Sequence, residues 1–151
     1  MIEGVKIKRL KLIPDDRGYL VELVKFGEET FIKIKQTTFT LTYPGIIKAF
    51  HYHKNQTDVW FVASGMIQVV LYDLRKESNT YQVKDVIFMG EQNPILVLIP
   101  PLVAHGYKVL GQKPALLFYH TDQAYNPENP DEYRISYNDP KIGFDWSVKF
   151  R

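Results

Sequence analysis

The sequence predicts an all-β protein, a sandwich or barrel of antiparallel strands, with a jelly roll as the natural form for its size. Short runs rich in Val, Ile, Tyr, Phe and Thr follow one another along the chain, separated by Gly, Pro and Asn. No stretch shows a helical spacing of apolar residues long enough to compete. The 151 residues suffice for one domain with its own core, which we expect to span 1–151.

The expected strands are bounded by turn-forming residues. Gly18 precedes the second run, Gly45 precedes the fourth, and Ser64-Gly65 forms a turn after the fifth. The runs themselves cover 5–12, 19–26, 31–42, 46–53, 57–64, 66–75, 81–89, 95–100, 104–110 and 114–121. From 124 to 151 the chain becomes polar and rich in proline, which predicts a long loop with short extended pieces that wraps the body.

The composition excludes several classes of protein. Lys and Arg number 19 against 17 Asp and Glu, which does not suggest a partner such as nucleic acid or a membrane surface. Because the chain has no cysteine, it has no disulfide framework, no zinc ribbon and no thiolate nucleophile. The longest apolar stretch, 94–104, is too short to span a bilayer, and no apolar signal core follows Met1, so we expect a cytoplasmic protein.

Three histidines and one aspartate form a first candidate site. His51 and His53 are two apart on an expected strand, so their side chains share a face. The segment GIIKAFHYHKNQTDVWFVASG resembles the first motif of cupins, which are small β-barrels, with Asp58 where that motif has Glu; His105 falls where the second motif supplies a third histidine. These four residues would suit Mn, Fe, Ni or Zn. The alternative is that no metal binds and His53 faces solvent or a hydrogen-bond partner.

A second resemblance extends over most of the chain. Its seven blocks, in order, are PDDRGYLVEL, QTTFTLTYPG, GIIKAFHYH, DLRKESNTY, NPILVLIPPLVAHGY, LLFYHTDQAYNPE and NDPKIGFDW. Together they resemble the motifs of the dTDP-4-dehydrorhamnose 3,5-epimerase family. The resemblance implies a cupin-type jelly-roll homodimer that uses no metal and no nicotinamide. It also implies a nucleotide-linked 4-keto-6-deoxy sugar as substrate, epimerised at the carbons flanking the ketone, in deoxysugar or polysaccharide biosynthesis.

By motif position, the resemblance assigns His51 as the base that removes a proton next to the ketone and Tyr119 as the acid that returns one to the opposite face. Tyr119 and His120 point to opposite faces of their expected strand, so only one of them enters the pocket, and we expect Tyr119. The resemblance places further residues beside the sugar and the nucleotide, namely Arg17, Glu22, Gln36, Lys48, Asn93, His105 and Tyr125.

The sequence departs from the family's pattern at three places. His53 stands where the family has Gln, and Asp58 stands where it has a lysine that helps to stabilise the enolate. A carboxylate has the wrong charge for that task. The family's aspartate that orients the catalytic histidine lies beyond the GFDW motif, and this sequence ends at Arg151 without it. Three alternatives stay open: a metal-assisted epimerase, a sugar ketoisomerase, and a cupin that binds a sugar nucleotide without catalysis.

The N-terminal stretch 2–13 is the candidate for assembly. It is rich in β-forming residues and would leave an edge strand in need of a partner. A homodimer that exchanges such strands fits the family, and a monomer with a covered edge is the alternative.

Overall fold

The computed structural model describes residues 1–148, and in that range it contains no helix, hence none that would span a membrane. Its strands are β1 (Lys6–Arg9), β2 (Ile13–Asp15), β3 (Gly18–Leu20), β4 (Gln36–Thr42), β5 (Ile47–Tyr52), β6 (Asp58–Ser64), β7 (Met66–Asp73), β8 (Lys84–Gly90), β9 (Ile95–Ile99), β10 (Val103–Leu110), β11 (Ala115–Thr121) and β12 (Tyr133–Arg134). The predicted all-β class is confirmed.

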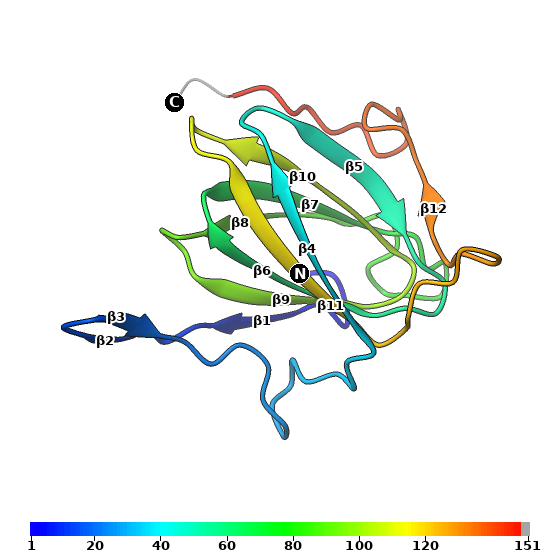
Figure 1. The fold of residues 1–151 in the computed structure, drawn as a ribbon. Coiled ribbons are helices and arrows are strands. Elements are labelled where there is room, and N and C mark those ends of the chain that lie inside the picture. Colours follow the sequence, from blue (N-terminus) through cyan, green and yellow to red (C-terminus); the bar gives the residue numbers. More distant parts are fainter. Residues whose placement is uncertain (149–151) are drawn as a thin grey trace.

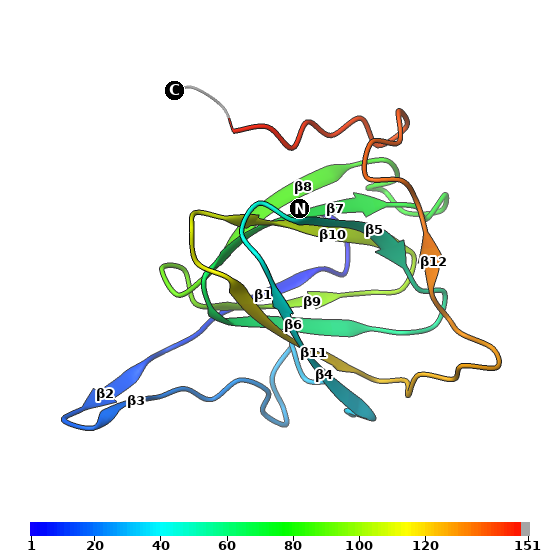
Figure 2. The ribbon, with the colours of Figure 1, turned by 45° about the horizontal axis from the view of Figure 1, so that its top comes forward.

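Two five-stranded antiparallel sheets face each other (Figure 1, Figure 2). The first sheet has the order β1-β9-β6-β11-β4, and the second has the order β12-β5-β10-β7-β8. Strands β2 and β3 form a separate hairpin that projects away from both sheets (Figure 1). The expected edge strand in 2–13 is β1, which pairs with β9 at the edge of the first sheet.

Three expected strands are shorter in the structure than the sequence suggests, and the run 5–12 forms a strand only over Lys6–Arg9. Strands β5 to β11 lie within a few residues of their expected bounds, but 19–26 forms a strand only as far as Leu20, and 31–42 only from Gln36. The apolar residues between them pack instead, as Ile32 does, against Val59 and Leu96 of the first sheet. Burial by packing, without backbone pairing, therefore explains part of the apolar pattern of this segment, whereas Phe26, Phe31 and Ile34 are exposed.

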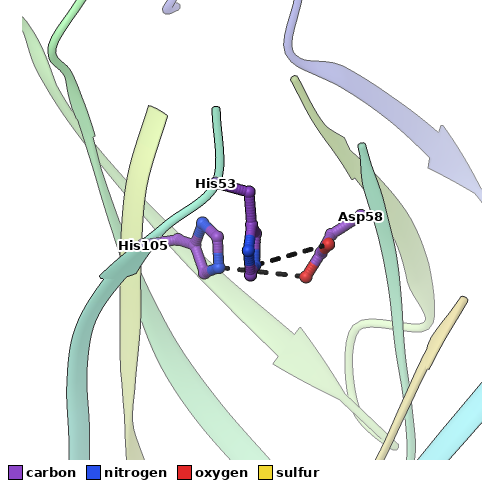
Figure 3. Close-up of side chains that lie close together, drawn as sticks. All are labelled: His53, Asp58 and His105. Atoms are coloured by element: carbon purple, nitrogen blue, oxygen red, sulfur yellow. Dashed lines mark ion pairs between the residues drawn. The ribbon is translucent and has the colours of Figure 1, made fainter. Parts of the chain in front are cut away.

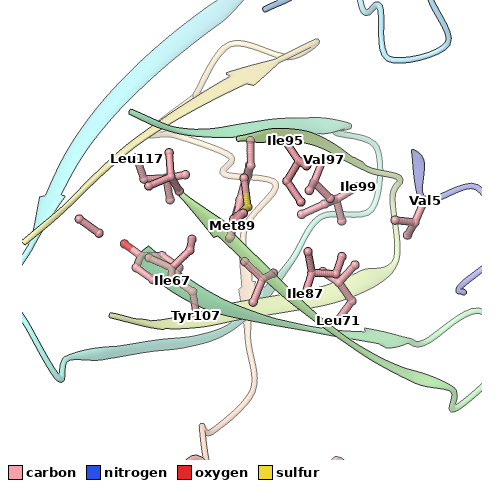
Figure 4. Close-up of a cluster of buried hydrophobic side chains, with 14 of the residues drawn as sticks. Val5, Ile67, Leu71, Ile87, Met89, Ile95, Val97, Ile99, Tyr107 and Leu117 are labelled. Atoms are coloured by element: carbon pink, nitrogen blue, oxygen red, sulfur yellow. The ribbon is translucent and has the colours of Figure 1, made fainter. Parts of the chain in front are cut away.

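The main core fills the space between the sheets (Figure 4). Alternate residues point inward from each strand, such as Val97 and Leu117 from the first sheet and Leu71 and Met89 from the second. Each of these four side chains is at most 1% exposed, and burying one such side chain contributes about 1.5–3 kcal/mol to stability. Leu117 also lines the cavity described below, as does Trp60 of the same core, so the core and the cavity wall are continuous.

The C-terminal segment covers the outer face of the second sheet. Ile142 and Trp146 are buried there in one cluster with Phe50 and Tyr72, and the Trp146 ring lies 5.6 Å from the Phe50 ring. Lys108 Nζ donates a hydrogen bond to the Trp146 carbonyl oxygen at 2.7 Å. The tail predicted for 124–151 thus runs along the sheet as far as 148, and its last three residues lie outside the described residues.

Gly106 allows β5 and β10 to approach each other closely. A Cβ atom on Gly106 would lie 2.2 Å from Ala49 Cβ, far inside van der Waals contact. The pairing register shifts between His105 and Tyr107, and on one side of the shift His105 pairs with His51. The missing side chain at Gly106 therefore lets these two histidines lie opposite each other.

Asp73 anchors the loop that follows β7. Its buried carboxylate accepts hydrogen bonds from Arg75 Nε at 2.8 Å, from Arg75 Nη2 at 2.9 Å and from Thr80 Oγ1 at 2.7 Å. Burial raises the pKa of Asp73, but these hydrogen bonds outweigh burial and hold the pKa well below its usual value. Arg75 Nη2 also donates to the Glu3 carbonyl oxygen at 2.6 Å, so the same group fastens the N-terminus.

We expect Asp73→Asn to lower the free energy of unfolding at neutral pH by about 3 kcal/mol, because Arg75 loses its buried counter-charge. Since the folded pKa of Asp73 is lowered, its carboxylate stabilises the fold above the unfolded pKa of about 3.9 and loses this contribution as the pH falls toward the folded pKa. Urea unfolding of both proteins over a range of pH measures the effect, with the exposed Asp16→Asn as the matched control. A stability difference that stays the same down to about pH 3 would contradict the prediction.

Candidate active site

A cavity of about 700 Å³ opens between the two sheets. This volume is within the range of small-molecule pockets. Its walls come from both sheets, from the loop between β5 and β6, and from the segment that follows β11. Of the residues predicted from the sequence, those that line it are Gln36, Lys48, His51, His53, Asp58, His105, Tyr119 and Tyr125.

The second sheet carries the histidines. His51 of β5 and His105 of β10 are cross-strand partners, and their ring centroids are 5.7 Å apart. His53 follows directly after β5, and its ring lies 5.4 Å from that of His105. Burial holds the pKa of His105 well below its ordinary value, so this imidazole is neutral at pH 7. The three rings thus form one group on this wall of the cavity.

Asp58, the first residue of β6, faces the histidines from the first sheet (Figure 3). Its carboxylate oxygens lie 3.8 Å from His53 Nε2 and 3.8 Å from His105 Nε2. Gln56 Nε2 at 2.7 Å and Trp60 Nε1 at 3.0 Å donate hydrogen bonds to the same carboxylate. Burial raises the pKa of Asp58, and the neighbouring His53 and these two hydrogen bonds oppose the rise.

These contacts bring three of the four residues of the cupin-like motif into one group and leave the fourth outside it. Among residues 1–148, the candidate ligand atoms of His53, Asp58 and His105 all lie within 4.8 Å of one another, and His51 is not a member of this group. The structure therefore brings together three of the four predicted metal ligands. It leaves His51 as a separate side chain on the same wall.

Strand β12 brings two charged residues next to His51. Arg134 is the cross-strand partner of His51, and Glu132 lies two residues earlier and therefore on the same face. Burial lowers the pKa of His51, and Glu132 is the charged neighbour that most strongly opposes this shift. Glu132 Oε1 in turn accepts hydrogen bonds from Arg134 Nε at 3.1 Å and Nη2 at 2.9 Å. The sequence did not reveal this carboxylate, because motif spacing says nothing of where the tail runs.

Tyr119 lies on the opposite wall from His51. It belongs to β11 of the first sheet, where it pairs with Thr38 of β4 and shares a side-chain hydrogen bond with it. Burial raises the pKa of Tyr119, while the Thr38 hydrogen bond opposes the rise, so the phenol is protonated at pH 7. The predicted alternation on this strand is confirmed, because Tyr119 lines the cavity whereas the His120 ring hydrogen-bonds Thr37 at 2.9 Å outside it.

The remaining cavity residues link separate parts of the chain. Lys48 Nζ of β5 donates a hydrogen bond to Thr40 Oγ1 of β4 at 3.2 Å, which connects the two sheets. Gln36 Oε1 accepts a hydrogen bond from the Tyr125 amide at 2.8 Å, which ties the start of the tail to β4. A lysine, an amide and an aromatic ring therefore stand along this side of the cavity.

Arg17, Glu22 and Asn93 lie outside the cavity of their own chain. Arg17 is in the β2–β3 hairpin, where it forms an ion pair with Asp15. Glu22 lies in the segment that follows the hairpin. Asn93 Nδ2 donates a hydrogen bond to the Phe88 carbonyl oxygen at 2.6 Å and so stabilises the turn between β8 and β9. These three residues therefore do not line the cavity of their own chain, because the hairpin projects outward and the turn holds the Asn93 amide.

Comparison with known proteins identifies the family. The family model described as dTDP-4-dehydrorhamnose 3,5-epimerase matches residues 1–151. The chain belongs to this family. The spore coat polysaccharide biosynthesis protein SpsL of Bacillus subtilis (strain 168) is 52% identical over 151 residues, which is 100% of both chains. The probable low-salt glycan biosynthesis epimerase Agl13 of Haloferax volcanii is 35% identical over 150 residues, covering 98% of this chain and 96% of that protein.

Solved structures of dTDP-sugar epimerases share the fold. The dTDP sugar isomerase of Desulfovibrio desulfuricans G20 superposes with a TM-score of 0.89 at 29% identity, covering 96% of this chain and 92% of that one. The epimerase RmlC of Legionella pneumophila Philadelphia 1, solved in complex with dTDP-4-keto-L-rhamnose, gives a TM-score of 0.85 at 28% identity, with coverage of 98% and 81%. Both the predicted family and its cupin-type jelly roll are confirmed.

Asp131 fastens the loop between β5 and β6 to the tail. Its carboxylate accepts hydrogen bonds from the backbone amides of Lys54 and Asn55 at 2.8 Å and from that of Gln56 at 3.1 Å. Its carbonyl oxygen accepts one from His53 Nδ1. Burial raises the pKa of Asp131, but the three amide hydrogen bonds outweigh it and lower the pKa. One tail residue therefore holds the whole loop that carries His53 toward Asp58.

We expect Asp131→Ala to lower the free energy of unfolding by about 1–3 kcal/mol, because three backbone amides lose their acceptor. Hydrogen exchange at the amides of residues 54–56 should accelerate by about tenfold or more, while exchange in the core strands changes much less. Mass spectrometry of exchange measures both, and Glu128→Ala, at an exposed tail position, is the control. Unchanged protection of these three amides would show that Asp131 does not hold the loop.

Proposed function

We propose that the protein epimerises a nucleotide-linked 4-keto-6-deoxy sugar, with His51 as the base and Tyr119 as the acid. The observation that carries this proposal is that the two side chains stand on facing walls of one cavity, His51 on the second sheet and Tyr119 on the first. Inversion at a carbon requires that a proton leave from one face and another arrive at the opposite face. Burial favours a neutral imidazole and a protonated phenol, the forms that these two roles need.

The reaction proceeds through an enolate. His51 takes the proton from the carbon next to the ketone, and the electron pair of the broken C–H bond moves onto the carbonyl oxygen. Tyr119 then donates its hydroxyl proton to the opposite face of that carbon, a new C–H bond forms, and the ketone is restored. Exchange with water returns both side chains to their starting forms. Each positioned acid or base contributes about 10²–10⁴ in rate.

The charge around His51 supports its role as a base. A carboxylate near a histidine base stabilises the imidazolium that forms when the proton is taken. Glu132 supplies this negative charge in our proposal, since it opposes the burial-induced fall in the pKa of His51. Lys48 provides positive charge on the same strand as His51, where it can stabilise developing negative charge on the sugar.

The substrate class and the biological role follow from the relatives. RmlC of Legionella pneumophila was solved with dTDP-4-keto-L-rhamnose, and SpsL and Agl13 carry names from spore coat polysaccharide and glycan biosynthesis. We propose that this protein supplies an epimerised sugar nucleotide for a polysaccharide and acts in the cytoplasm. We propose that Tyr125, which lines the cavity and is 59% exposed, stacks on the nucleotide base.

Solvent exchange tests these roles. With dTDP-4-keto-6-deoxyglucose in deuterated water, the wild type should incorporate deuterium next to the ketone and form an epimerised product. His51→Asn should lose exchange by at least about 10²-fold, because no base remains. Tyr119→Phe should still exchange, since His51 can return a deuteron to the face from which it took the proton, but should lose most inverted product. Tyr137→Phe, at an exposed position, is the matched control.

Other outcomes of the same experiment would replace the proposal. A product whose carbonyl has moved to the neighbouring carbon, seen by NMR, would identify a ketoisomerase. Tight binding of the sugar nucleotide with no exchange would identify a non-catalytic binding protein. Exchange that survives in His51→Asn at the wild-type rate would reject His51 as the base.

We further propose that the protein forms the homodimer that the family resemblance implies, and that the β2–β3 hairpin of one chain enters the partner's cavity. Arg17 is at the tip of this hairpin, and Tyr19 and Leu20 beside it are 61% and 59% exposed. The edge strand β4 also presents exposed Phe39, and Tyr43 directly after it is 69% exposed. Exposed apolar side chains grouped in this way are typical of interaction surfaces. An exchanged hairpin would bring Arg17 and Glu22 to a sugar nucleotide bound by the other chain.

Mixed dimers test the exchange. We expect Arg17→Ala and His51→Asn each to be nearly inactive alone. After co-refolding in equal amounts, activity should return to about a quarter of the wild-type value, because half the dimers are mixed and each mixed dimer has one intact site. Sedimentation equilibrium gives the oligomeric state. A monomer, or a mixture without restored activity when Arg17→Ala alone is inactive, would contradict the exchange.

A further inference from the structure

His53 and His105 each turn Nδ1 toward a backbone carbonyl oxygen and Nε2 toward Asp58. His105 Nδ1 is 3.0 Å from the Val103 carbonyl oxygen, and His53 Nδ1 bonds the Asp131 carbonyl oxygen. A carbonyl oxygen only accepts hydrogen bonds, so Nδ1 must carry the proton in both rings. In a neutral imidazole the other nitrogen, Nε2, then holds a lone pair. Both Nε2 atoms point toward the Asp58 carboxylate (Figure 3).

Asp58 offers lone pairs in return. Gln56 and Trp60 each donate one hydrogen bond to it, one to each carboxylate oxygen, which favours the ionised form and fixes its orientation. A carboxylate oxygen has a second acceptor position. When both imidazoles are neutral and Asp58 is ionised, three hydrogen-bond acceptors converge, two imidazole nitrogens and one carboxylate, in a place where Asp58 and His105 are at most 3% exposed. Buried acceptors that face one another without a donor between them are unfavourable.

We propose that His53, Asp58 and His105 bind one divalent first-row transition-metal ion. Nitrogen and oxygen ligands lie about 2.0–2.2 Å from such an ion, so ligand atoms that share it are about 3–3.5 Å apart. The two separations from Asp58 are 3.8 Å, and all three candidate ligand atoms lie within 4.8 Å of one another, so rotations of the side chains would complete the site. Two histidines and one carboxylate are a donor set that suits Mn, Fe, Co, Ni or Zn.

The partners of the three ligands have the form expected around a metal. Metal-binding histidines generally donate their other ring proton to a carbonyl or carboxylate, which fixes the tautomer and the orientation of the ring. Both rings do so here, to Val103 and to Asp131. Ligating carboxylates are likewise hydrogen-bonded by neighbours, as Asp58 is. Three protein ligands leave coordination positions for water or substrate in the cavity.

The ion would also compensate for the negative charge of Asp58, which stands where the family resemblance leads one to expect a lysine. This part of the inference rests on the proposed function. A carboxylate beside a developing enolate opposes the reaction, whereas a divalent ion bound to that carboxylate makes the site net positive. A bound ion stabilises an oxyanion as a Lewis acid. His53 and Asp58 would then act together in place of the lysine that the family resemblance leads one to expect.

Metal content tests the site directly. The full chain, without a polyhistidine tag and purified without chelator, should contain about one equivalent of metal per chain by mass spectrometry. After treatment with chelator, titration with Co²⁺ should restore one equivalent, followed by calorimetry and by the visible absorption of the bound ion. Asp58→Asn keeps the shape and its contact with Gln56 but removes the charge, and His53→Gln restores the family's residue. Each should weaken Co²⁺ binding at least about tenfold. His120→Gln, a histidine outside the cavity, is the matched control and should bind like the wild type.

The outcomes separate the site from the reaction. Less than about a tenth of an equivalent in the purified protein, together with no Co²⁺ binding to the chelator-treated protein, would overturn the site. Equal Co²⁺ binding by the wild type and both variants, with folding verified by circular dichroism, would overturn it as well. Metal binding with unchanged deuterium exchange after chelation would uphold the site and reject its role in catalysis. If the metal-loaded wild type shows no deuterium exchange, the proposed function is rejected, whereas the metal site is upheld.

Discussion

The alternation of side chains on two facing sheets is the constraint on which the rest of this structure depends. Each inward position joins the apolar core, the cavity wall or both, as β11 shows: Ala115 belongs to the core, Leu117 to the core and the cavity wall, and Tyr119 reaches the cavity. Polar groups placed inside lose water and need partners. Asp58 has Gln56 and Trp60 as partners, Lys48 has Thr40, and Gln36 has the backbone amide of Tyr125.

Alternation predicts the strands well where an apolar pattern and backbone pairing coincide. Strands β5 to β11 meet this condition, because each pairs with a neighbour while its inward residues are buried. It fails between Leu20 and Gln36, where Leu23 and Ile32 are part of a cluster on the first sheet without extending it. The spacing of apolar residues indicates which side chains are buried. It does not show whether the backbone also pairs with a neighbouring strand.

The site shows the same limit at the level of single residues. The family resemblance predicted that His51, His105 and Tyr119 share a cavity, and each sits on a strand that the sequence predicts. Asp131 and Glu132 could not be predicted, because they belong to a polar tail whose path depends on where distant apolar residues dock. Residues assigned by family likeness alone, such as Arg17 and Asn93, lie outside the cavity of one chain for the reasons given above.

The two substitutions that set this chain apart, His53 and Asp58, occupy one small volume. Each would be a defect by itself, because an extra imidazole is an acceptor without a donor and Asp58 is a buried negative charge. A bound cation would give both side chains a partner, because it accepts the lone pair of His53 and balances the charge of Asp58. Changes of this kind are expected to be coupled, since contacting residues in one network do not contribute independently.

The docked tail contributes both to the ligand cavity and to the packing of the fold. Residues in its first part, 124–134, form a wall of the cavity, while Trp146 near its end is anchored in a cluster with Phe50 on the outer face of the second sheet. Detachment of the tail would remove β12 from the edge of the second sheet and open the cavity while the remaining strands stay paired, so the affinity for a ligand includes the local stability of one peripheral segment. Natural variation at Trp146 can therefore tune substrate affinity from the side of the sheet that faces away from the substrate.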